Sequence, residues 1–126
     1  TLMDRLMFNS GSTKISNKGK KILKLIGNEL KRLRYGIIYV EGHTDSDRVV
    51  AWRLKRKYPT NWEFSVIRAV NVVRYLVERT GVNPARIIAA GRSRYVPRQS
   101  NTTQRGKALN RRIEILISPE RRILTR

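Results

Sequence analysis

This chain of 126 residues has no cysteine, one histidine and no long apolar run. The lack of cysteine excludes disulfides and thiol chemistry, and it leaves the cellular compartment open. The one histidine, His43, is too few for a structural zinc site, which usually takes four cysteine or histidine ligands. The carboxylates do not have metal-ligand spacing either, so we expect no metal and no cofactor. We expect His43 to be a hydrogen-bonding turn residue and not a catalytic base.

The apolar runs are short. The longest, residues 37–40, falls far below the roughly 20 residues that a membrane-spanning helix needs. No signal peptide is recognisable, and the first residue is Thr1. We interpret the sequence as a single excised domain, residues 1–126, with any anchor or signal upstream of it.

Acidic residues are also few. Lys and Arg number 28 and Asp and Glu only nine, so the formal net charge is +19. Such a field attracts anions over long range. Nucleic acid, an anionic membrane surface and an acidic wall polymer all fit, and charge alone does not choose among them.

Hydrophobic spacing predicts an α/β fold of order β-α-β-α-β-β, a two-layer sandwich with helices on one face of a mixed sheet. Strands are expected at residues 2–8, 37–41, 86–90 and 111–118, and helices at residues 18–33 and 61–80. Asn61 is expected to cap the second helix, and Gly81 to end it. Residues 46–60 remain unassigned as an insert loop, and residues 91–108 read as a polar connection.

The segment Gly42-His43-Thr44-Asp45 follows the strand at residues 37–41. In open α/β sheets, ligands bind at the carboxyl ends of strands. A carboxylate at Asp45 is therefore placed to receive an ammonium group. Asp is also common in turns, and composition alone favours a turn-capping role for Asp45.

A polar stripe begins the second helix. Asn61, Ser65 and Arg68 are spaced i, i+4 and i+7, so they share one face. The stripe differs from the apolar stripe that starts at Val66 and Ala69. The guanidinium of Arg68 offers a planar fork to a carboxylate, although an ordinary solvated arginine would fit the pattern as well.

The triplet Asn110-Arg111-Arg112 stands where the last strand begins. Asn110 could fix a loop by bonding backbone groups. Successive strand residues point to opposite faces, so one arginine could face a ligand while its neighbour faces away. The alternative is a basic strand edge that discourages edge-to-edge pairing.

In this order, the three motifs resemble the peptidoglycan-binding domain of the OmpA/MotB family over about residues 37–118. The matching positions also include Tyr75-Leu76, Gly81-Val82, Arg86-Ile87, Gly91 and Pro97. Two details resemble the flagellar-motor MotB-like branch, namely Asn61-Trp62-Glu63 and Phe8-Asn9-Ser10-Gly11-Ser12.

The resemblance implies non-covalent binding to the peptide stem of peptidoglycan. It assigns the side-chain ammonium of diaminopimelate to Asp45 and a carboxylate to Arg68, facing one surface cleft from opposite ends. The remaining cleft residues that it implies are Thr44, Asn61, Phe64, Ser65, Asn110 and Arg111.

The resemblance further implies a bacterial periplasmic anchor, attached to the inner or outer membrane through an upstream segment, with peptidoglycan as partner and a homodimer left open. A motor stator and an outer-membrane protein both fit this description. Two departures are a phenylalanine at Phe64, where the family often has leucine, and the insert at residues 46–60.

Two other functions compete with the anchor. A basic nucleic-acid-binding module is suggested by charge, but the basic residues are scattered over every predicted element. A wall-cleaving enzyme is disfavoured, because no paired-carboxylate or metal constellation is recognisable. We therefore expect a binding domain that is not an enzyme.

Overall fold

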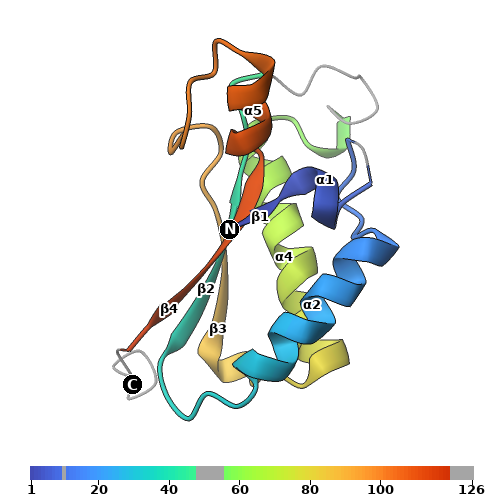
Figure 1. Ribbon diagram of the computed structural model, residues 1–126, viewed down its shortest axis with the longest axis vertical. Coiled ribbons are helices and arrows are strands. Elements are labelled where there is room, and N and C mark those ends of the chain that lie inside the picture. The colour runs from blue at the N-terminus through green and yellow to red at the C-terminus, as the bar shows by residue number, and fades with distance from the viewer. Residues whose placement is uncertain (10, 48–55, 120–126) are drawn as a thin grey trace.

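A four-stranded mixed sheet forms one layer of the protein, seen in a computed structural model that describes residues 1–9, 11–47 and 56–119 (Figure 1). The strands are β1 (Leu2–Met3), β2 (Ile37–His43), β3 (Ile87–Gly91) and β4 (Arg112–Ser118). Their order across the sheet is β1-β4-β2-β3. Strand β2 pairs in parallel with β3 and antiparallel with β4, so the sheet is mixed.

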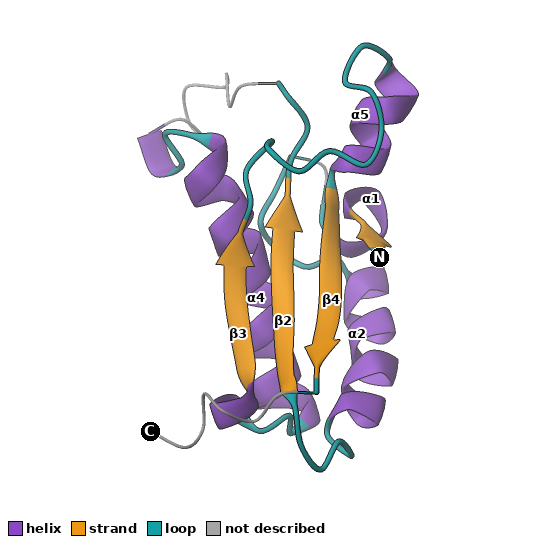
Figure 2. Cartoon of the chain, turned by 90° about the vertical axis from the view of Figure 1, so that its left-hand side faces the viewer, coloured by secondary structure: helices purple, strands orange, loops and turns teal. Residues whose placement is uncertain are grey.

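Two long helices, α2 (Asn17–Leu30) and α4 (Asn61–Thr80), cover one face of this sheet (Figure 2). Helix α4 is the crossover that joins the parallel strands β2 and β3. The short 3₁₀ turn η1 (Pro84–Arg86) completes this connection. The opposite face of the sheet carries no helix in the described part of the chain (Figure 2). The predicted fold class, helices on one face of a mixed sheet, is confirmed.

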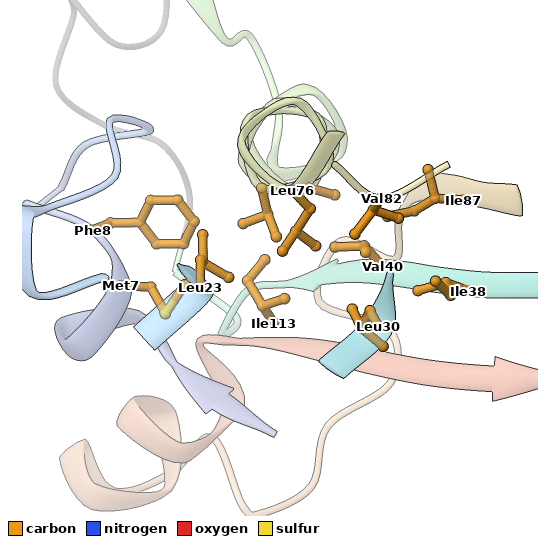
Figure 3. Close-up of a cluster of buried hydrophobic side chains, with 12 residues drawn as sticks. Met7, Phe8, Leu23, Leu30, Ile38, Val40, Leu76, Val82, Ile87 and Ile113 are labelled. Atoms are coloured by element: carbon orange, nitrogen blue, oxygen red, sulfur yellow. The ribbon is translucent and has the colours of Figure 1, made fainter. Parts of the chain in front are cut away.

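The core lies between the two helices and the sheet (Figure 3). Leu23 and Leu30 of α2, Leu76 of α4 and Val40 of β2 point into it. Burying one such side chain stabilises the fold by about 1.5–3 kcal/mol. The apolar side chains of α2 and α4 therefore determine which faces of the two helices meet the sheet. The buried cluster comprises Met7, Phe8, Leu23, Leu30, Ile38, Val40, Ala69, Val72, Leu76, Val82, Ile87 and Ile113.

The first half of α4 lies very close to the ends of β2 and β3. A Cβ atom added at Gly42 would overlap the backbone oxygen of Ser65, and one added at Gly91 would overlap Val66. Only glycine permits such an approach without displacing the helix. The two glycines therefore set the start of α4 directly over the carboxyl ends of the parallel strands.

The N-terminal segment differs from the prediction. Residues 2–8 were expected as one strand, but β1 is only Leu2–Met3 and a short helix α1 (Asp4–Met7) follows. The Phe8 N–H donates to the Asp4 carbonyl, and the single helical turn that this bond closes buries Met7. The prediction of a strand beyond Met3 was therefore wrong.

Two further expectations are corrected. Thr60 caps α4, not Asn61, and forms a capping box with Glu63. The connection expected at residues 91–108 contains the start of a helix, α5 (Gln104–Asn110), which Thr103 caps by accepting a hydrogen bond from the Gly106 N–H. Helix α5 has little apolar periodicity, so its cap was the one signal available.

Candidate functional site

Asp45 lies just beyond the end of β2 and is only 5% exposed. One carboxylate oxygen, Oδ1, accepts a hydrogen bond from the Asp47 N–H at 2.8 Å, which is the turn-capping role considered from the sequence. The other oxygen, Oδ2, accepts a short charged hydrogen bond from Nη1 of Arg111. Turn capping and charge pairing are therefore both present in one carboxylate.

Arg68 is the most enclosed cation of the cluster, with 4% of its surface exposed. Its guanidinium carbon lies 4.4 Å from the ring centroids of both Phe8 and Phe64. Nε donates to the Ser12 carbonyl at 3.0 Å, and Nη1 donates to Oδ2 of Asp4 at 3.2 Å. Burial lowers the pKa of Arg68, and the negative charge of Asp4 opposes that shift.

Arg111 joins the two halves of the site. Besides its bond to Asp45, its Nε lies 3.4 Å from Oδ2 of Asp4, which also pairs with Arg68. The charges therefore alternate along one connected row of four side chains, Asp45, Arg111, Asp4 and Arg68. Two anions and two cations balance, so the cluster is locally neutral within a strongly basic protein.

The row leaves hydrogen-bonding capacity unused. Within the described part of the chain, Nη2 of Arg68 donates no hydrogen bond, so one end of the guanidinium fork lacks an acceptor. Each oxygen of Asp45 accepts one hydrogen bond, and a carboxylate oxygen has two lone pairs. Within the described residues, unused acceptor capacity at Asp45 and unused donor capacity at Arg68 thus lie at the two ends of the row.

Three predicted neighbours support this row. The Thr44 N–H donates to the Ser93 carbonyl at 2.9 Å, and the Ser93 N–H donates to Oγ of Ser65 at 3.2 Å. The side chain of Asn61 donates to the Asp47 carbonyl at 2.9 Å. The strand-end motif and the first turns of α4 are therefore bonded to each other, as the sequence motifs require if they form one site.

Asn110 lies in the interior of the protein. It is fully buried, and its Oδ1 accepts from the N–H groups of Arg98 and Gln99 at 2.7 and 2.9 Å. Its Nδ2 donates to the Gln99 carbonyl and to Oδ1 of Asn101. With its amide fully occupied, Asn110 fixes a loop, as one reading of the sequence proposed, and its place in the cleft stays a prediction.

The exposure expected for the main pair also needs correction. Both Asp45 and Arg68 were expected at a surface cleft, but both are buried. Ser65, expected on a polar stripe, is buried with Ala69, while Val66 of the expected apolar stripe is 36% exposed. The buried face of α4 starts with polar residues because Ser65 lies against Gly42 and Gly91 and bonds to Ser93, while Arg68 belongs to the charged row.

The sequence analysis missed Asp4, Phe8 and Tyr58. Asp4 joins the row because its N–H donates to the Arg111 carbonyl, which brings its carboxylate to Arg111 and Arg68, and no spacing in the sequence shows that. Tyr58, at the described end of the insert, bonds Oγ1 of Thr13 at 3.0 Å and packs edge-on against Phe64 at 5.5 Å. Most of the insert at residues 46–60 lies outside the described residues.

His43 ends β2 inside the protein and is 3% exposed. Its Nε2 lies 3.3 Å from Oε1 of Glu41, and Nδ1 has no hydrogen-bond partner. Burial, helped by the nearby charge of Arg112, lowers the pKa of His43, so the imidazole is neutral at pH 7. The described residues contain no group of three or more His, Cys, Asp and Glu side chains placed to hold a metal ion.

Arg112 points away from the charged row. Its Nε donates to Glu114 at 2.7 Å and its Nη2 to the Val96 carbonyl at 2.9 Å. Arg111 and Arg112 thus face different surroundings, as their places at the start of a strand predicted.

None of the helices in the described ranges is long and apolar enough to cross a bilayer.

Comparisons with known proteins give a consistent assignment. A model of the OmpA family matches residues 7–111. Motility protein B of Bacillus subtilis is 34% identical over 119 residues, which cover 94% of this chain and 44% of that protein. The chain spans about half the length of the curated relatives it matches.

Two solved structures share the fold closely. A MotB-like protein from Desulfovibrio vulgaris has a TM-score of 0.84 at 29% identity, covering 94% of this chain and 73% of that chain. The cell wall anchor of the T6SS from Pseudomonas aeruginosa has a TM-score of 0.81 at 32% identity, covering 94% of this chain and 78% of that chain.

Proposed function

The chain belongs to the OmpA family, and from that premise we propose that it binds peptidoglycan non-covalently and serves as a cell-wall anchor. The observation that carries the proposal is the row of alternating charges from Asp45 to Arg68. The similarity to a cell wall anchor of known structure supports the same function. The proposal concerns this domain and places it at the bacterial cell wall, in the periplasm.

The ligand that we propose is the free end of a diaminopimelate side chain in the peptide stem. That end is zwitterionic, so it carries one ammonium and one carboxylate. The ammonium is assigned to Asp45, where it shares or replaces the position of the Arg111 guanidinium. The carboxylate is assigned to the free end of the Arg68 fork, which suits a planar acceptor.

Thr44, Asn61, Phe64 and Ser65 are proposed as supporting residues of this site. Phe64 packs against the Arg68 guanidinium and so limits its motion, while Ser65 and Thr44 hold the strand end to α4 through Ser93. A guanidinium held in one orientation loses less entropy when it binds a carboxylate. The role proposed for these residues is positioning, and no bond in the ligand is cleaved.

Binding to purified peptidoglycan sacculi tests the proposal. Asp45→Asn removes the charge that receives the ammonium and keeps the size of the side chain. Losing a charged hydrogen bond of about 1.5–3 kcal/mol weakens binding about 10- to 100-fold. Asp47→Asn is the matched control, because Asp47 has the same charge, lies two residues away and has a 61% exposed side chain.

Co-sedimentation with sacculi at about 0.15 M salt gives the measurement, and circular dichroism checks that both variants fold. The proposal is supported if Asp45→Asn binds at least tenfold more weakly than Asp47→Asn. Equal binding by the two variants would remove Asp45 from the site. Failure of the unsubstituted chain to sediment with sacculi would reject the anchor function itself.

A further inference from the structure

Two aromatic side chains form an exposed stacked pair outside the charged row. The rings of Trp62 and Tyr95 have centroids 5.5 Å apart with an interplanar angle of 29°. Trp62 is 47% exposed and Tyr95 is 61% exposed. In a stacked pair the inner faces cover each other, and the guanidinium carbon of Arg94 lies 5.3 Å from the centroid of the Tyr95 ring. Tyr95 therefore backs the pair, and the outer face of Trp62 is the aromatic surface that it offers to a ligand.

The backbone around the pair is constrained. Among the residues that the structure describes, Ser93 is the one non-glycine residue with positive φ, at 54°. It is buried, its N–H donates to Oγ of Ser65, and its carbonyl accepts from the Thr44 N–H. Such a conformation persists only where surrounding contacts fix it, and it often marks a functional site.

This turn places the aromatic pair beside the charged row. Tyr95 follows Ser93 by two residues, and Trp62 precedes the hydrogen-bonding Ser65 by three in the same helix. Ser93 bonds to Thr44, whose neighbour is Asp45. Counting about 3.8 Å per residue and about 5 Å across a backbone hydrogen bond, the Cα atoms of Tyr95 and Asp45 are at most roughly 17 Å apart.

We propose that the Trp62–Tyr95 pair is a platform for one pyranose ring of the glycan strand. The axial C–H groups of a β-linked hexosamine form an apolar face with a partial positive charge. An aromatic ring is negative on its face, so the two surfaces attract each other while water is displaced. The inference rests on the proposed function, because it concerns the sugar part of the same polymer.

The connection between ligand parts favours a sugar as the occupant. A peptide stem is covalently attached to the glycan strand, so a stem held at Asp45 brings sugar rings within a few residue lengths of it. Three extended residues span about 10 Å, and the upper bound above permits a separation of that length. The platform would then contribute affinity for the strand and set its direction past the charged row.

A neutral oligosaccharide tests the platform separately from charge. The probe is the tetramer of β-1,4-linked N-acetylglucosamine, which has no peptide and no charge, so the net charge of +19 does not contribute to its binding. The chain has two tryptophans, Trp52 and Trp62. In the variant Trp52→Phe, the emission of Trp62 alone reports the titration, and calorimetry on the unsubstituted chain repeats it without that change.

We expect a saturable change in Trp62 emission, and at least a tenfold loss of oligosaccharide affinity when Tyr95→Ala is added. Tyr35→Ala is the matched control, since Tyr35 is also 59% exposed but precedes the start of β2, at the other end of the sheet. Sacculus binding should weaken several-fold in Trp62→Ala and remain unchanged in Tyr35→Ala.

The outcomes separate this inference from the proposed function. Sacculus binding without any response to the oligosaccharide would overturn the platform and leave the anchor function standing. Equal oligosaccharide affinity in Tyr95→Ala and Tyr35→Ala would overturn it as well. Binding of single-stranded oligo(dT) at 0.3 M salt that depends on Tyr95, with no oligosaccharide binding, would assign the platform to nucleobases instead.

Discussion

At the scale of single residues, Arg68 is a structural residue as well as a proposed ligand-binding one. It is sandwiched between two aromatic rings and bonded to the Ser12 carbonyl and to Asp4. Removing Arg68 leaves the Ser12 carbonyl and one lone pair of the Asp4 carboxylate without a donor inside the protein. The sequence predicted Arg68 at a surface cleft, and the burial of the side chain means that substituting it also affects stability.

We predict that Arg68→Ala lowers the free energy of unfolding by about 3 kcal/mol, as breaking a buried ion pair commonly does. Urea denaturation measures this. Arg74→Ala is the control, because the Arg74–Glu78 pair on the same helix has 66% and 56% exposed side chains and contributes under about 0.5 kcal/mol. Comparable losses in the two variants would show that the contacts of Arg68 do not stabilise the fold.

His43 gives a second prediction at this scale. Its pKa in the folded protein is lowered from 6.5 by burial first and by the charge of Arg112 second, while Glu41 and Glu114 act in the opposite direction. Well above pH 6.5 the imidazole is neutral in both states, so the stability does not depend on its titration there. Below pH 6.5 the unfolded chain takes up a proton that the folded chain does not, so stability falls as the pH falls towards the lower, folded pKa.

Since His43 is the only histidine, His43→Gln should remove the dependence of stability on pH between about 7.5 and 5.5. Urea denaturation at several pH values in this range, on both proteins, makes the comparison. An unchanged slope in the variant would mean that another group titrates there and that His43 is not the source.

At the scale of elements, a close contact between α2 and α4 determines how the two long helices pack. Gly27 of α2 lies against Thr80 of α4, and a Cβ atom added at Gly27 would overlap the Thr80 hydroxyl. A substitution there would push apart the two helices that hold the N-terminal segment and the start of α4 together.

We predict that Gly27→Ala destabilises the protein by about 1–3 kcal/mol through overpacking, even though alanine is the better helix former by about 1 kcal/mol. Thermal or urea unfolding tests this. Lys24→Ala, on an exposed position of the same helix, should change stability by less than about 0.5 kcal/mol. A gain in stability for Gly27→Ala would show that the two helices separate freely.

At the scale of the whole molecule, the net charge of +19 makes non-specific DNA binding at low salt an expected property, whatever the function. Such binding depends on the release of counterions, so it weakens steeply with added salt. The ligand proposed for the charged row has no net charge, and the row itself is locally neutral and largely buried. Its binding should therefore depend far less on salt.

We predict that DNA binding is lost between about 50 and about 300 mM salt, while sacculus binding changes only slightly over that range. Parallel titrations of a DNA fragment and of sacculi measure the two slopes. Tight, sequence-selective nucleic-acid binding at the upper end, together with no sacculus binding, would favour the nucleic-acid module over the anchor.

Much of the fold was determined by local sequence. The apolar spacing in residues 18–33 and 61–80 predicted two helices, and the run at residues 37–41 predicted a covered central strand, because each pattern allows only one way to bury its apolar side chains. The order of the three motifs indicated the family, and the family match confirms it. The sequence also allowed Arg111 and Arg112 to face different ways, and they do, although Arg111 lies between α5 and β4 and only Arg112 belongs to the strand.

The tertiary structure decided what surrounds each charge. Asp4 and Arg68 are 64 positions apart in the chain, and no local pattern shows that they pair. Likewise, Tyr95 meets Trp62 only because Ser93 turns back onto Thr44 and Ser65. Local periodicity reports which side of an element is buried, whereas these contacts depend on how α1, α4 and the loop after β3 pack together. Burial and pairing are properties of that packing, and they set the charge, orientation and accessibility of the proposed site.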